Sequence, residues 1–365
     1  MRRWVIGFAV MLLMPWVVSL VWMRSAGIEA KAEQGLLSDQ TEYGETEQAG
    51  QAGDRSGRKE ALWREDQSDG ELQEDSGNPG NGENENAADS NEPSEASGES
   101  RKRKILVERK GIKTYIDLED YLPGVIACQI DTSYHSEALK CQAVIARTYV
   151  YRLMDGRTEI YEEELDMDYL GEGEGSLTGD RMKAVDSLKR CREAVQDTGG
   201  VVMKYEDRYI LPLFHAISAG RTREGEVDFP YLQSVESVSD TKRDDYMQVM
   251  EWSQDSFAEA ISQIPGASGV DVKQMQTIKK DESGYMVEMK IGSGSYSGDA
   301  IQYALGLPSP CFGVETEGNV IRVRIRGRGH GYGLSQAGAD AMAESGWGYE
   351  DILNYYYKNI SLISE

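Results

Sequence analysis

Three separated stretches of the sequence place polar side chains on a backbone of small residues. Small residues let an extended ligand approach the backbone, and guanidinium, imidazole, hydroxyl and amide groups supply hydrogen bonds. A binding site for an extended polymer needs this combination. The candidate substrate-binding residues are Arg147, Tyr149, His215, Ser218, Gly220, Arg221, His330, Gly331, Gly333, Ser335 and Gln336.

Each stretch also has a simpler structural interpretation. Arg147 lies in a run of small and apolar residues, where a guanidinium forms a buried salt bridge about as often as it lines a cleft. A lone histidine such as His215 belongs to the core or a loop more often than to a site. The glycine-rich stretch 327–333 can serve as a tight structural turn. The sequence leaves these alternatives open.

Two other activities fit these residues less well. A serine hydrolase would pair Ser218 or Ser335 with His215 or His330, but the chain lacks a G-x-S-x-G stretch. The glycine spacing in 327–333 also occurs in dinucleotide-binding loops, which require a surrounding βαβ unit. No βαβ alternation follows the stretch, so neither activity is favoured.

Three ordered segments resemble one known family. Residues 118–152, LEDYLPGVIACQIDTSYHSEALKCQAVIARTYVYR, resemble the opening motif of the sporulation stage II protein D/LytB family (SpoIID), whose members cleave peptidoglycan. Residues 198–240 and 327–357 resemble two further motifs of that family, in the same order. Chance explains one such match far better than three in sequence.

The resemblance implies a lytic transglycosylase that cuts between MurNAc and GlcNAc, but this chain departs from the family at the expected acid. The family carries a catalytic Glu where this sequence has Gln129, and an amide has no proton to give a glycosidic oxygen. Asp131 and Glu137 are the nearest replacements, and their simpler roles are a turn residue and a helix-start acid. We therefore expect either cleavage of glycan strands, with catalytic candidates Gln129, Asp131 and Glu137, or binding with weak or no cleavage.

The resemblance also implies a biological setting. Peptidoglycan glycan strands are the expected ligand, in cell-wall remodelling during sporulation and engulfment. A cell-wall amidase and a membrane partner of the engulfment machinery are the expected protein partners, and we expect no nucleic acid. No cofactor or metal is predicted, because none of the three histidines stands at metal-binding spacing with a cysteine. The four cysteines form no disulfide framework by spacing.

Composition divides the chain into three parts. Residues 1–24 hold an uncharged apolar run from Trp4 to Met23, which is long enough to cross a bilayer. We expect a single-pass anchor in the cell membrane with the rest of the chain outside the cytoplasm; a cleaved signal peptide is the alternative. Residues 25–100 have the composition of a disordered acidic linker, because residues 65–100 contain twelve acids and neither Lys nor Arg.

Residues 101–365 are the expected SpoIID-like domain, in one body or two lobes. The pattern predicts a hairpin around Lys110-Gly111, a helix over 118–126, and a second helix capped by Ser136. Leu139, Ala143, Ala146 and Val150 form the buried stripe of that second helix. Further expected elements are two strands in 201–217, a hairpin in 277–298, a strand over 321–325 and helices over 181–196, 257–264, 298–305, 335–344 and 349–357. Without repeats or βαβ alternation, the class is α+β.

Overall fold

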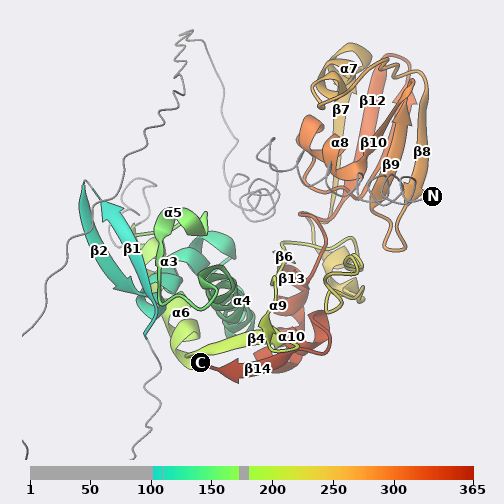
Figure 1. Ribbon diagram of the computed structural model, residues 1–365. Coiled ribbons are helices and arrows are strands. Elements are labelled where there is room, and N and C mark those ends of the chain that lie inside the picture. Colours follow the sequence, from blue (N-terminus) through green and yellow to red (C-terminus); the bar gives the residue numbers. More distant parts are fainter. Residues whose placement is uncertain (1–101, 110, 172–180) are drawn as a thin grey trace, which may run out of the picture. The chain divides into compact units, whose positions relative to one another are not determined.

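The computed structural model describes residues 102–109, 111–171 and 181–365 (Figure 1). The expected anchor, 1–24, and acidic linker, 25–100, lie outside these ranges. All the described residues belong to one compact unit. None of the helices within the described ranges is both long and apolar enough to span a membrane. Helices and sheets are mixed without βαβ alternation, which confirms the α+β class.

A helical core carries the first motif. Its helices are α3 (Leu118–Gln129), α4 (Ser136–Met154), α5 (Glu162–Leu165) and α6 (Arg181–Asp197). A sheet in the order β2-β1-β3 packs beside them, formed by β1 (Lys104–Arg109), β2 (Ile112–Asp117) and β3 (Glu159–Tyr161). The predicted hairpin is confirmed, since β1 and β2 pair antiparallel. The first helix continues beyond the expected end, so Gln129 is its last residue.

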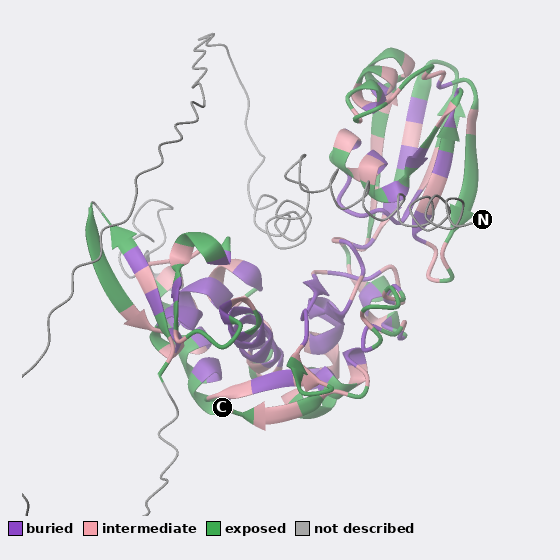
Figure 2. Cartoon of the chain, in the orientation of Figure 1, coloured by how far each residue is buried: buried purple, intermediate pink, exposed green. Residues whose placement is uncertain are grey.

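Helix α4 is central because it contributes to two hydrophobic cores. Its predicted stripe is confirmed as buried (Figure 2), and this stripe packs in the core with α3 and α6. Ala138, Cys141 and Ile145 on α4 enter the second core, with the C-terminal helices. The expected cap at Ser136 is wrong by one residue: the N-cap is His135, whose Nδ1 accepts a hydrogen bond from Glu137 N at 3.2 Å.

The second core is built from the other two motifs. The elements of this part of the chain are β4 (Val201–Tyr205), β5 (Arg208–Tyr209), β6 (Phe214–His215), β13 (Leu334–Ser335), β14 (Ser361–Ser364), the 3-10 helix η2 (Val238–Lys242), α9 (Gln336–Glu344) and α10 (Tyr349–Tyr356). The expected second strand in 201–217 is divided into β5 and β6. Pro212 lies between them, and proline cannot donate to a strand ladder.

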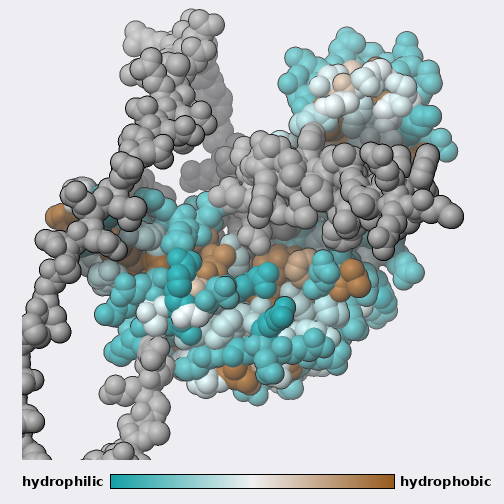
Figure 3. Space-filling view, viewed as in Figure 1, coloured by the Kyte–Doolittle hydropathy of each residue, from teal (hydrophilic) through white to brown (hydrophobic). Residues whose placement is uncertain are grey.

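Residues 247–326 form a further lobe with its own hydrophobic core, which we call the insert lobe. It contains β7 (Met247–Ser253), α7 (Gln254–Ser262), β8 (Met275–Lys280), β9 (Met286–Ile291), β10 (Gly294–Ser297), α8 (Gly298–Leu305), β11 (Phe312–Glu317) and β12 (Val320–Arg326). Two sheets, β10-β9-β8 and β11-β12-β7, hold it together. Its visible surface is largely hydrophilic to neutral (Figure 3). At the base of the lobe, Gly327 N donates a hydrogen bond to Tyr246 O at 2.8 Å. This bond joins the segment that enters the lobe to the segment that leaves it.

Candidate functional site

The second and third motifs meet at a short parallel pair of strands. β6 and β13 align Phe214 with Leu334 and His215 with Ser335. Glycines permit this close approach: a Cβ on Gly329 would lie 2.8 Å from the Cβ of His215, and one on Gly333 would lie 1.8 Å from Leu213 O. Part of the glycine cluster is therefore required for packing alone, as the simpler interpretation proposed.

His215 and His330 form a buried pair. Their ring centroids lie 5.8 Å apart at 62°. His215 Nδ1 lies 3.0 Å from Tyr332 O, so Nδ1 carries the proton and donates it, which leaves Nε2 as an acceptor. His330 Nδ1 accepts from Tyr332 N at 3.0 Å. The loop that carries His330 thus also orients His215.

Both imidazoles are neutral at neutral pH. Burial lowers the pKa of His215 to about 4, although the Tyr332 carbonyl acts in the opposite direction. Burial, together with His215 nearby, lowers the pKa of His330 well below its ordinary value. The Nε2 atom of His215 is buried and has no hydrogen-bond partner among the described residues. A neutral acceptor of this kind suits a hydroxyl or amide N–H better than an anion.

Gln129 belongs to a buried network of three amides. Gln142 Nε2 donates to Gln129 Oε1 at 2.9 Å, and Gln336 Nε2 donates to Gln142 Oε1 at 3.1 Å. Gln336 Nε2 also donates to the main-chain oxygen of Gln129 at 2.7 Å. The network connects α3, α4 and α9, so Gln129 and Gln336 come together although 207 positions separate them. Sequence reasoning missed Gln142. Its polar side chain among the apolar residues of a buried helix was the feature that could have pointed to it.

A small hollow lies beside Gln129. Tyr149 also lines it, with Ile145, Ala146, Met167 and residues 211–214. Its internal volume is about 10 Å³, which is close to the minimum that holds one water molecule. A sugar ring cannot enter such a space. Any glycan that reaches Gln129 must therefore lie across the outside of this hollow.

The two replacement acids serve structural roles. Asp131 is exposed, and its Oδ1 accepts from Ser133 N at 2.9 Å and Ser133 Oγ at 2.7 Å, an Asx turn. Glu137 accepts from Lys140 Nζ at 2.8 Å and from Tyr349 N at 2.9 Å. Burial acts to raise the pKa of Glu137, but the Lys140 ammonium and the Tyr349 amide outweigh it and lower the pKa. Glu137 is therefore ionised at neutral pH, without a proton to donate.

Arg147 requires a correction, because it is fully buried and cannot touch a polymer. Its Nε and Nη2 each lie 2.7 Å from the carboxylate of Glu119. Its remaining donors reach Val195 O at 3.2 Å and Val201 O at 3.1 Å. The guanidinium thus joins α3, α4, α6 and β4. The structural salt bridge, one of the two alternatives left open by the sequence, describes this residue.

Asp240 organises the two candidate serines. Its Oδ2 accepts from Ser218 N and from Ser335 Oγ, each at 2.7 Å, and Ser335 Oγ also accepts from Gly338 N at the start of α9. Burial raises the pKa of Asp240, while the hydrogen bonds from Ser218 and Ser335 act to lower it. Both serines are fully buried and held by this carboxylate rather than by a histidine. This geometry gives the serine hydrolase hypothesis no support.

The remaining candidates lie around the same loops. Gly220 and Gly331 have φ values of 98° and 85°, a region that favours glycine. Arg221 is partly exposed and lies 3.4 Å from both Ser234 Oγ and Glu236 Oε1, so it is only loosely held. Within the described ranges, no three His, Cys, Asp or Glu side chains are grouped to hold a metal ion. All four cysteines, which lie within those ranges, are free thiols.

Comparison with known proteins decides the family. Residues 108–205 match the family model of the stage II sporulation protein, SpoIID. The stage II sporulation protein D of Bacillus subtilis (strain 168) is 30% identical over 260 residues, covering 68% of this chain and 74% of that protein. The chain belongs to the SpoIID family.

The chain is also 30% identical over 266 residues to the stage II sporulation protein D of Bacillus amyloliquefaciens, with the same coverage. An uncharacterised protein of Brachyspira hyodysenteriae is 25% identical over 259 residues. The resemblance to this family of sporulation proteins is thus confirmed.

Proposed function

We propose that this SpoIID-family protein binds peptidoglycan glycan strands during remodelling of the sporulating cell wall and cleaves them weakly or not at all. The observation that carries the proposal is the buried hydrogen bond from Gln142 to Gln129. It fixes an amide at the position where the family has its acid. Removing a general acid/base typically costs about 10² to 10⁴ in rate.

The other nearby carboxylates give no replacement for this acid. Asp131 is used in a turn, and Glu137 is ionised and bound to Lys140 and Tyr349. A displacement of even about 1 Å from the productive geometry can cost about 10²-fold in rate. Lytic transglycosylase cleavage is therefore the less favoured candidate, and product analysis tests it directly.

The chemistry of the surrounding groups favours an uncharged polymer. Gln129 borders the hollow with its apolar lining, and the amide of Gln336 and the neutral imidazole of His215 lie buried behind it. Sugar hydroxyl and N-acetyl groups match such donors and acceptors, whereas an anion would call for a cationic site. Arg221, partly exposed at the neighbouring loop, can meet carboxylates of the muramic acid units.

The cellular setting is part of the proposal. Residues 1–24 would anchor the protein in the cell membrane, with the acidic segment 25–100 as a spacer to an extracytoplasmic domain. A binding protein without its own cleavage acts through partners. The proposed ones are a cell-wall amidase and a membrane protein of the engulfment machinery.

The test uses the full-length protein and glycan strands stripped of stem peptides. We expect wild type to sediment with the strands, soluble glycan oligomers to compete, and chromatography to yield few anhydro-ended products. His215→Gln and Gln336→Leu should weaken sedimentation, whereas the exposed Gln276→Leu should leave it unchanged. Absence of binding by folded wild type would overturn the proposal, and rapid release of anhydro-muropeptides would restore the enzyme alternative.

A further inference from the structure

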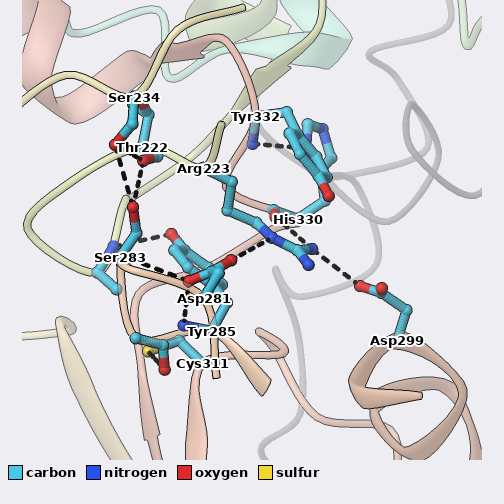
Figure 4. Close-up of polar contacts among 12 residues, drawn as sticks. Thr222, Arg223, Ser234, Asp281, Ser283, Tyr285, Asp299, Cys311, His330 and Tyr332 are labelled. Atoms are coloured by element: carbon cyan, nitrogen blue, oxygen red, sulfur yellow. Dashed lines mark hydrogen bonds and ion pairs between the residues drawn. The ribbon is translucent and has the colours of Figure 1, made fainter. Parts of the chain in front are cut away.

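Arg223 lies at the contact between the insert lobe and the histidine loop, which we define as residues 330–332 (Figure 4). It is only 5% exposed. Its Nε lies 3.1 Å from Asp281 Oδ2, and its Nη1 lies 3.2 Å from Asp299 Oδ1. Both acids belong to the insert lobe: Asp281 follows β8, and Asp299 lies in the first turn of α8. One guanidinium therefore holds two separate parts of that lobe.

Arg223 also lies 5.2 Å from the ring centroid of Tyr285 in the insert lobe, and it makes further contacts with the histidine loop. Its main-chain N donates to Gly331 O at 2.7 Å, and its Nη1 lies 3.4 Å from His330 O. The guanidinium carbon lies 4.5 Å from the ring centroid of Tyr332, a cation–π contact. Arg223 thus touches three successive residues, and one of them orients both imidazoles: Tyr332 N donates to His330, and Tyr332 O accepts from His215.

A second residue of the insert lobe supports the same loop. Tyr285 N donates to Asp281 Oδ1 at 2.9 Å, and the Tyr285 hydroxyl accepts from Ala219 N at 3.0 Å. A Cβ on Gly331 would lie 2.4 Å from the Tyr285 ring, so the ring rests directly on this glycine. The same carboxylate, Asp281, therefore holds both Arg223 and the tyrosine that packs on the loop.

We propose that Arg223 is a positioning residue through which the insert lobe fixes the histidine loop, and that glycan binding at the surface over His215 and His330 depends on this connection. The glycan part rests on the proposed function; the positioning of the histidines does not. The two acids that bind Arg223 differ in how far their side chains are exposed to solvent. The Asp281 side chain is 25% exposed and that of Asp299 is 58% exposed. Asp299 is therefore the partner that can be removed with the least disturbance of packing.

The positive charge gives the proposal a spectroscopic signature. Burial and the neighbouring His215 are the larger causes that lower the pKa of His330, and the positive charge of Arg223 lowers it further. Removing the charge must therefore raise that pKa. Loosening the loop acts in the same direction, because imidazole exposed to water is easier to protonate. A change in Arg223 that acted only on global stability would leave the folded-state titration of His330 unchanged.

The experiment labels the histidines of the full-length protein isotopically and follows their imidazole signals by NMR against pH. The chain contains only three histidines, so each signal can be assigned by substitution. The variants are Arg223→Gln, Asp299→Asn and the control Arg324→Gln, whose ion pair with Glu315 lies within the insert lobe. Affinity for stripped glycan strands is measured on the same samples.

We expect Arg223→Gln to move the His215 and His330 signals and raise the pKa of His330. Asp299→Asn should move the same signals by less, and Arg324→Gln should leave them unchanged. If the loop keeps its arrangement in a tenth of the molecules, apparent glycan affinity falls about tenfold.

Signals in Arg223→Gln that match those of Arg324→Gln would overturn the proposal. If Arg223→Gln does not fold, Asp299→Asn decides by the same comparison. If the histidine signals shift but the protein binds no glycan, the positioning role stands and the proposed function alone is overturned.

Discussion

The Nε2 of Gln142 donates a hydrogen bond to Oε1 of Gln129 across 2.9 Å, between two helices of the first motif. A carboxylate oxygen at the same place would accept the same hydrogen bond. The site therefore retains the surroundings that a glutamate would need, although the residue itself is an amide.

Gln129→Glu is expected to gain glycan cleavage over a weak or inactive wild type. The replacement is close to isosteric, and burial among apolar side chains should raise the pKa of the new carboxyl, as a general acid requires. Arg147, which would have opposed that rise at close range, is bound to Glu119 instead. Chromatography of anhydro-muropeptides from stripped glycan strands measures the gain. Asp131→Ala is the control, and wild-type cleavage that survives it and is not increased by Gln129→Glu would contradict the expectation.

Gln142→Leu is expected to destabilise the fold, because it removes the central member of the amide network. Gln129 Oε1 and Gln336 Nε2 each lose a partner in a buried setting, and an unpaired buried polar group costs about 1–3 kcal/mol. Urea unfolding measures the loss. The exposed Gln276→Leu is the matched control, with an expected change within about 0.5 kcal/mol. Equal stability of the two variants would show that the network contributes nothing.

Arg147→Lys is expected to lower stability while leaving the glycan affinity of the folded protein unchanged. A lysine cannot bind both oxygens of Glu119 and also reach the Val195 and Val201 carbonyls. Breaking a fully buried pair costs about 3–5 kcal/mol, and this change should cost less because the Glu119 side chain is 39% exposed and lysine keeps the charge. Arg152→Lys, at an exposed position in the last turn of α4, is the control. Lost affinity at full stability would return Arg147 to the binding site.

The free energy of unfolding is expected to fall as the pH is lowered from about 6.5 to about 4, in part because of His215. Its folded pKa, about 4, lies below the ordinary value of 6.5, so the unfolded chain binds the extra proton in this window. The stabilisation is complete above pH 6.5 and is lost as the pH falls towards 4. Each such group contributes a slope of about 1.4 kcal/mol per pH unit.

His215→Asn removes this titration and should reduce the slope of unfolding free energy against pH. Denaturant unfolding from pH 4 to pH 8.5 measures both proteins. Above pH 7 their slopes should coincide, because His215 is neutral there in both states. An unchanged slope below pH 6.5 would contradict the buried, neutral state of His215.

Local sequence determined the elements and the membership of the family. The spacing of Leu139, Ala143, Ala146 and Val150 predicted a helix and its buried face, because the helical period alone decides which side chains share a side. The Lys110-Gly111 hairpin and the helices that follow the glycine stretch were predictable for the same local reason. Motif order identified SpoIID and the substitution at Gln129, since both are properties of the sequence itself.

Tertiary structure alone decided which of the singled-out residues meet. Arg147 and Gln142 stand on one helix, yet one faces Glu119 and the other faces Gln129. Asp240 and Arg223 lie within the second motif but were not singled out, because their importance comes from partners brought together only by folding. Gln336 reaches Gln129 across 207 positions, and Arg223 reaches Asp299 across 76. Such contacts depend on how several hydrophobic faces pack at once, and no local pattern of residues encodes that packing.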